Sequence, residues 1–155
     1  MLATEPRPHY RCTVEAERSW NRASALLRSW MWDSREDFAQ RRWYEDYGVR
    51  IQGVVSDPLA IIDKIRDIQL ALEALRQVNV NAALLCWHNV EHPDPKAMKA
   101  DSPDQWHNSR GTGFCDRLSL PYSDAETLFN AGKEYVFAQL EDEPLMMAVL
   151  QVLGR

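Results

Sequence analysis

The chain has 155 residues, of which 45% are hydrophobic and 26% are charged, and its net charge is −5. These values fit one globular domain with a real core, and the negative charge argues against a generic nucleic-acid coat. No run approaches the roughly 18 consecutive apolar residues of a membrane-spanning helix. The first residues lack the apolar centre of a secretory signal, and three widely spaced cysteines do not suggest a disulfide framework. We therefore expect a cytoplasmic protein with no membrane contact.

Basic and acidic residues are unevenly distributed along the chain. Residues 1–50 contain nine arginines and eight acidic residues, whereas residues 51–155 contain nine basic and fifteen acidic residues. Arginine forks suit phosphates and carboxylates better than lysine does. The first fifty residues are therefore the better surface for an acidic partner, unless these arginines lie on ordinary solvated helix faces.

The N-terminal third contains one strong helix signal. Residues 1–12 include two prolines and no periodicity, and we expect them to form an arm. A helix is predicted to begin after Thr13 as N-cap, and its apolar face consists of Trp20, Ala23, Leu27 and Trp30. A short second helix through Tyr44 is predicted to follow. Residues 49–55 are expected to form an extended connector, with one short strand as the alternative.

The clearest predicted helix begins near Ser56, with a proline in its first turn. Five apolar residues then follow at 4-3-4-3 spacing: Ile61, Ile65, Ile68, Leu72 and Leu75. Leu59, Ile62 and Leu70 widen this stripe. A stripe of that width favours a core-facing helix over the alternative of a dimer seam.

The remainder of the chain is predicted to be helical apart from one long loop. Two asparagines interrupt the previous helix, and a buried helix is expected over 82–90. The loop over 91–113 is rich in proline and polar residues. Helices are predicted around 113–119, from Ser123 to about Glu141, and from about 142–144 to Gly154. We therefore expect an all-α helical bundle, with residues 13–155 forming a single domain.

Small and apolar residues between positions 114 and 136 follow the order found in a helix-turn-helix. The pattern contains a turn over 121–123 and these residues: Phe114, Cys115, Leu118, Ser119, Leu120, Ala125, Phe129, Gly132 and Val136. This spacing resembles region 4 of sigma factors, which reads promoters. More loosely, residues 57–140 and the segment LLRSWMW resemble phage antitermination proteins of the Q type. That resemblance implies a module over 113–140 that binds DNA and RNA polymerase.

The same resemblance implies a set of DNA-binding residues. Thr127 and Asn130 would read bases, and Lys133 would bind a phosphate. A basic face would come from Arg41, Arg42, Lys96, Lys99, Arg110 and Arg117. Two observations point away from DNA: Ser119 replaces the usual turn glycine, and Asp124, Glu126 and Glu134 would repel phosphates. The alternative is that both helices pack in the core through ordinary apolar periodicity.

A second group of residues has the chemistry of a metal site. His88 and His92 are four residues apart, the spacing by which a helix offers two ligands to zinc. His107 and Cys115 would complete the set. The alternative is that the histidines lie at a helix C-terminus, where the dipole favours a positive charge. The chain has no CxxC, HExxH or glycine-rich phosphate motif, and we expect no enzyme activity and no cofactor.

Two functions from different classes therefore follow from the sequence. The first is a transcription regulator of antitermination type that binds DNA, RNA polymerase or both. The second is a helical protein-interaction module, a regulator or inhibitor from a mobile element. That module would dock on an unidentified protein through its Trp/Arg surface or its acidic C-terminal half, and it predicts an exposed acidic or apolar patch and no affinity for DNA.

Overall fold

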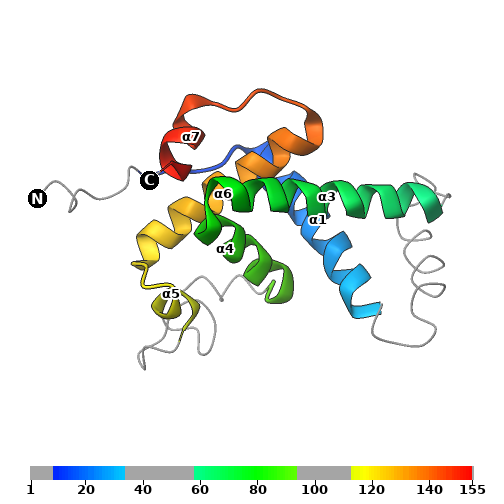
Figure 1. Cartoon of the computed structure of the whole chain (residues 1–155), viewed down its shortest axis with the longest axis horizontal. Helices are drawn as coiled ribbons and strands as arrows, with labels where there is room; N and C mark the ends of the chain where they lie inside the picture. Colours follow the sequence, from blue (N-terminus) through cyan, green and yellow to red (C-terminus); the bar gives the residue numbers. More distant parts are fainter. Residues whose placement is uncertain (1–8, 34–57, 94–112, 155) are drawn as a thin grey trace, which may run out of the picture.

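The computed structural model describes residues 9–33, 58–93 and 113–154 (Figure 1). Within these ranges the chain forms helices and connections but no strand, which confirms the predicted all-α class. The helices are α1 (Val14–Asp33), α3 (Pro58–Val78), α4 (Val80–Glu91), α5 (Phe114–Arg117), α6 (Tyr122–Glu141) and α7 (Met147–Leu153). The predicted second helix, the connector or strand over 49–55 and most of the loop over 91–113 lie outside the described residues.

Helix α6 lies at the centre of the fold, in contact with α1, α3, α4 and α7 (Figure 1). Small buried residues allow these close contacts: Ala125, Ala131, Gly132 and Ala138. A Cβ atom added to Gly132 would lie 3.0 Å from the sulfur of Cys86 and 3.2 Å from Leu75 Cδ2. Helices α3 and α4 therefore approach the backbone of α6 at this one residue, and α6 is buried over most of its circumference.

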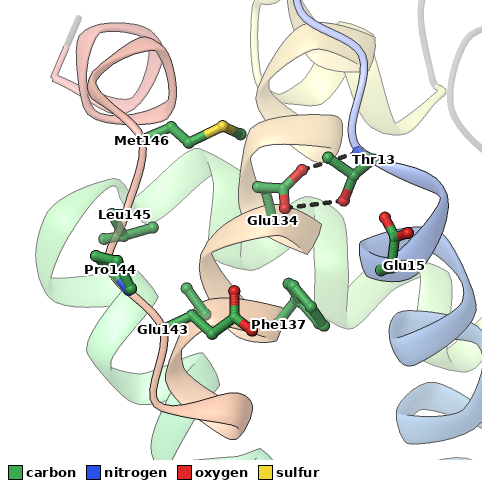
Figure 2. A pocket seen from close by; sticks show the side chains of 9 residues that line it. Thr13, Glu15, Glu134, Phe137, Glu143, Pro144, Leu145 and Met146 are labelled. Atoms are coloured by element: carbon green, nitrogen blue, oxygen red, sulfur yellow. Dashed lines mark hydrogen bonds between the residues drawn. The ribbon is translucent and has the colours of Figure 1, made fainter.

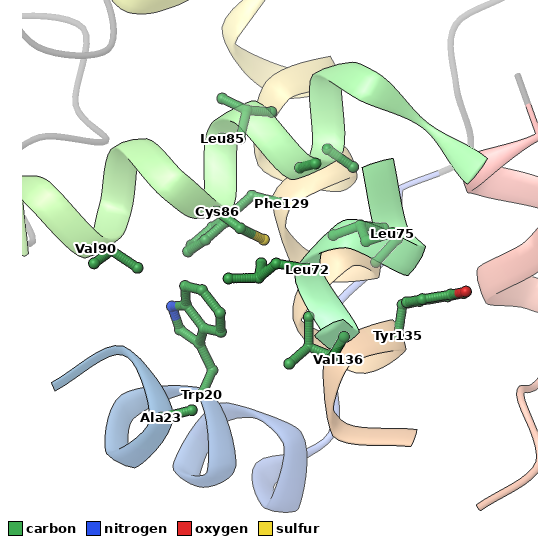
Figure 3. Packing of buried hydrophobic residues seen from close by; sticks show 14 of the residues in the cluster. Trp20, Ala23, Leu72, Leu75, Leu85, Cys86, Val90, Phe129, Tyr135 and Val136 are labelled. Atoms are coloured by element: carbon green, nitrogen blue, oxygen red, sulfur yellow. The ribbon is translucent and has the colours of Figure 1, made fainter. Parts of the chain in front are cut away.

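The core is built from the apolar faces that the periodicity predicted (Figure 3). All five residues of the α3 seam are buried, so this seam faces the core and not a dimer partner. The Trp20 ring meets the Phe129 ring edge-on with centroids 6.2 Å apart, and Trp20 Nε1 donates to Asn89 Oδ1 at 2.8 Å. Leu70 is 60% exposed, so its assignment to the stripe is wrong. It lies two positions from Ile68, which rotates it about 200° around the helix.

Asn79 makes the sharp corner between α3 and α4. Its backbone is extended, and its side-chain oxygen accepts from the amide of Ala82 at 2.9 Å, which caps α4. Its side-chain nitrogen donates to the carbonyl of Leu153 at 2.8 Å. One residue thus ends a helix, starts the next and fixes the C-terminal end of α7.

Two residues in the left-handed region terminate α5 and α6. Ser119 (φ 57°) closes α5, with the Leu120 amide donating to the Cys115 carbonyl and the Ser119 amide to the Asp116 carbonyl, the pattern of a Schellman motif. Asp142 (φ 52°) closes α6 at the predicted end. Helix α6 begins at Tyr122, one residue before the predicted cap. Helix α7 begins only at Met147, because the backbone of Met146 is still extended there and forms the N-cap.

Candidate functional site

The residues predicted to form a basic face are only partly described. Arg41, Arg42, Lys96, Lys99 and Arg110 lie outside the described residues. Arg117 is exposed on α5, with its guanidinium 5.8 Å from the centre of the Phe114 ring. Among the arginines of the first fifty residues, Arg28 donates from Nε to the carbonyl of Val90 at 2.6 Å. That arginine therefore binds the last turn of α4 within the fold.

The three residues predicted to contact DNA from α6 face other parts of the protein. Thr127 is 2% exposed and Lys133 is 4% exposed. Asn130 is half-buried, and its side-chain nitrogen donates to the carbonyl of Tyr10 at 3.0 Å. The interpretation of α6 as an exposed recognition helix is therefore not supported by its packing. The cause is tertiary: α1, α3, α4 and the segment before α1 cover the faces that a groove would need.

That segment, residues 9–13, is held against α6 by polar contacts, and we call it the N-terminal strap. The buried carboxylate of Glu134 accepts from the Thr13 amide at 2.9 Å, the Thr13 hydroxyl at 3.1 Å and the Tyr10 hydroxyl at 3.0 Å. Burial, followed by the bond to Glu134, raises the pKa of Tyr10 well above its usual value. The Thr13 hydroxyl also accepts from the Ala16 amide, which confirms Thr13 as the cap of α1.

Lys133 contributes to the same interior network. Its ammonium lies 2.5 Å from a carboxylate oxygen of Glu17 on α1 and 4.4 Å from the centre of the Phe129 ring. Burial opposes ionisation of Glu17, but hydrogen bonds from Lys133 and Cys12 outweigh it and lower the pKa of Glu17. Lys133 is thus a structural cation that joins α6 to α1.

A half-open pocket lies beside the strap, between the start of α1, the last turns of α6 and the connection to α7 (Figure 2). Its volume is about 230 Å³. The lining contains Thr13, Glu15, Glu134, Phe137, Ala138, Glu143, Pro144, Leu145 and Met146. Among the described residues, the lining thus combines apolar side chains with three carboxylates and contains no cationic residue.

The three carboxylates differ in availability. Glu134 lies on the inner wall with both oxygens accepting from the strap. Glu15 and Glu143 are exposed, and neither has an ion pair within the described ranges.

Exposed apolar side chains flank the pocket. Val14 precedes Glu15 on α1 and is 61% exposed, and Met146, in the lining itself, is 45% exposed. Met147 and Leu150 follow on α7 and are 69% and 41% exposed. We call the pocket together with Val14, Met147 and Leu150 the docking face.

The predicted metal ligands are brought together only in part. The rings of His88 and His92 have centroids 4.6 Å apart, as their helical spacing predicted, and His88 stacks on Phe114 at 4.2 Å. Burial, with smaller contributions from His92 and Arg117, lowers the pKa of His88 to about 4. Burial raises the pKa of Cys115 to about 11. His107 lies outside the described residues, and within them no three ligands gather around one point.

Searches for similar proteins found no matching family model, no similar curated protein and no similar solved structure. No helix among the described residues has the length and apolar character needed to cross a bilayer.

The sequence did not predict the pocket, although some of the residues that form it were noted for other reasons. The sequence pattern predicts only a helix end near Glu141, and it presents Glu134 as a residue that would repel DNA. The turn at Asp142 instead places Glu143 on the rim of the pocket, and the strap gives Glu134 a structural role. A proline after an acidic helix end was the one local hint that the chain reverses there.

Proposed function

We propose that this chain is a non-catalytic protein-interaction module that binds another protein through the docking face. The observation that carries the proposal is an acidic pocket whose lining residues and their sequence neighbours include exposed apolar side chains, with no cationic side chain in the lining formed by the described residues. Apolar groups clustered beside a polar rim are typical of protein-binding sites. Methionine suits such a surface because its flexible, polarisable side chain adapts to a partner.

The way the face is built supports this role. Glu134 and Lys133 tie the start of α1 to the central helix, so one wall of the pocket is held by hydrogen bonds from two largely buried side chains. A pre-organised wall lowers the entropic cost of binding. The carboxylates of the face would repel nucleic-acid phosphates, so the favoured partner is a protein.

A first experiment tests the exclusion of DNA. The full chain is titrated into mixed-sequence duplex DNA at low and moderate salt, with fluorescence anisotropy as the readout. We expect no saturable binding at low salt. Binding that weakens steeply with salt would overturn the proposal, and its slope would count the neutralised phosphates.

A second experiment tests the docking face itself. Three forms of the chain are immobilised and exposed to a cell lysate: wild type, Met147→Asp, and Leu70→Asp as a matched change at an exposed leucine on α3. Any protein that wild type retains is identified and purified. The purified protein is then titrated against all three forms. We expect the purified partner to bind wild type and Leu70→Asp alike, and to bind Met147→Asp at least about tenfold more weakly. Equal binding to all three forms would place the interaction elsewhere and overturn the proposal.

A transcription regulator with a region-4-like module is the second candidate. The observation that favours it is Ser119, which adopts the left-handed conformation (φ 57°) where the region-4 pattern has its turn glycine. This candidate predicts salt-sensitive DNA binding in the anisotropy experiment. Arg117→Gln would then lower the salt slope by about one phosphate.

A further inference from the structure

The charge around the pocket restricts what can occupy it. Glu15 on α1, Glu134 on α6 and Glu143 on the connection to α7 supply its charged groups. The nearest buried cation, Lys133, is engaged by Glu17 and by the Phe129 ring. A negative pocket with exposed rim carboxylates favours a cationic occupant and disfavours phosphate or carboxylate ligands.

The apolar lining restricts the occupant further. Phe137, Leu145 and Met146 line the pocket, and they would leave a bare inorganic cation without ligands. Both oxygens of Glu134 already accept hydrogen bonds from the strap, which leaves only two rim carboxylates for a metal ion. The occupant must therefore carry apolar bulk together with its positive charge.

The size of the pocket indicates a side chain. Pockets for drug-sized molecules have volumes of about 300–1,000 Å³, whereas this one measures about 230 Å³ and is half open. One large side chain and the adjacent backbone fill such a space. Val14 and Met147 are the sequence neighbours of the lining residues Glu15 and Met146, and both are exposed, so they are the candidates to contact the flanking residues of a polypeptide.

We infer that the pocket binds a short basic-apolar segment of a partner protein, with an apolar side chain against Phe137 and Leu145 and an adjacent arginine paired with Glu143 and Glu15. Arginine fits better than lysine because its planar fork can meet carboxylates in a bidentate way and packs on apolar surface. This inference rests on the proposed function and names the chemistry of the partner.

The experiment uses the full chain labelled with ¹⁵N and two probes, N-acetyl-leucyl-arginine amide and N-acetyl-leucyl-citrulline amide. Citrulline has nearly the same shape as arginine but no charge. We expect the arginine probe to cause saturable shifts of the amide signals of Thr13, Phe137, Glu143 and Met146. The citrulline probe is expected to bind about tenfold more weakly, the effect of losing one charge-assisted contact.

Rim variants test the geometry. Glu143→Gln and Glu15→Gln are each expected to weaken the arginine probe about threefold, as is typical of exposed ion pairs. Glu141→Gln removes the same charge from an exposed residue of α6 outside the lining, and is expected to leave the affinity unchanged. Equal weakening by all three variants would show only a response to net charge and would overturn the inference.

The remaining outcomes separate the inference from the proposed function. If both probes bind equally, or if neither shifts the pocket amides, the inference fails. The proposed function would still be supported by a purified partner whose binding is weakened by Met147→Asp. If the arginine probe binds but no protein partner is found whose binding depends on Met147, the proposed function is wrong instead. Self-association that Met147→Asp abolishes would assign the face to a second copy of this chain and overturn the basic-segment assignment.

Discussion

Glu134 and Glu143 line the same pocket, but the structure surrounds their carboxylates in different ways. Glu134 is 5% exposed and accepts three hydrogen bonds from the strap, whereas Glu143 is exposed and has no ion pair within the described part of the chain. A carboxylate that is buried and fully bonded stabilises the fold, because its removal leaves donors unsatisfied. An exposed carboxylate contributes little to stability and is available for binding. The same residue type therefore has a structural role on the inner wall, and we propose a binding role for it on the rim.

The strongest test of this comparison is Glu134→Ala. It leaves the Thr13 amide and the Thr13 and Tyr10 hydroxyls without their acceptor, and we expect the free energy of unfolding to fall by about 3 kcal/mol. Urea denaturation followed by circular dichroism measures the change. Glu134→Gln keeps an acceptor oxygen and should lose about half as much. A loss below about 1 kcal/mol for the alanine variant would show that the strap contributes little to the fold.

The pH dependence of stability tests a second buried ionisable side chain, the imidazole of His88. The pKa of His88 is lowered to about 4 in the folded chain, from about 6.5 when unfolded. The unfolded state therefore binds more protons between these values, and stability falls as pH decreases from about 6.5 to 4. The full loss is about 3 kcal/mol. Stability measured by urea denaturation should depend less steeply on pH in His88→Phe than in wild type.

The apolar side of α6 provides the next comparison. Gly132→Val inserts a branched side chain where even a Cβ would lie 3.0 Å from the Cys86 sulfur. We expect a loss of about 2 kcal/mol, since overpacking costs about 1–3 kcal/mol. Thermal unfolding measures it, and the double variant Gly132→Val, Cys86→Ala should recover part of the loss. No recovery would mean that the strain lies in the α6 backbone and not at this contact.

The smallest stability effect is expected at the rim. Glu143→Gln should change the free energy of unfolding by less than about 0.5 kcal/mol, because the side chain is exposed. The same variant should weaken the arginine probe about threefold in the titration described above. A large loss of stability would show that Glu143 is a structural residue like Glu134, and the distinction between inner wall and rim would fail.

The interpretation of the C-terminal helix pair shows where sequence reasoning succeeded and where it did not. The end of α6 near Glu141 and the cap at Thr13 agree with the prediction, whereas the turn predicted over 121–123 lies earlier, around Ser119, and Tyr122 and Ser123 already belong to α6. Those features depend on residues a few positions apart. The sequence pattern placed Thr127, Asn130 and Lys133 on a DNA-contacting face, but in the structure they pack against other parts of the protein. The contacts of Asn130 and Lys133 come from the strap and from α1, which are distant in sequence.

The sequence by itself determined the existence of the described helices, the cap of α1 and the apolar seam of α3, because backbone capping and the 3.6-residue period act between near neighbours. Only the tertiary structure decided which polar residues became interior. The partners of Lys133 and Glu134 lie 116 to 124 residues earlier in the chain, and no local pattern specifies such pairs. The pocket follows from the same cause: it exists because the strap, the end of α6 and the connection to α7 meet in space, with Glu15 and Glu143 left at its edge.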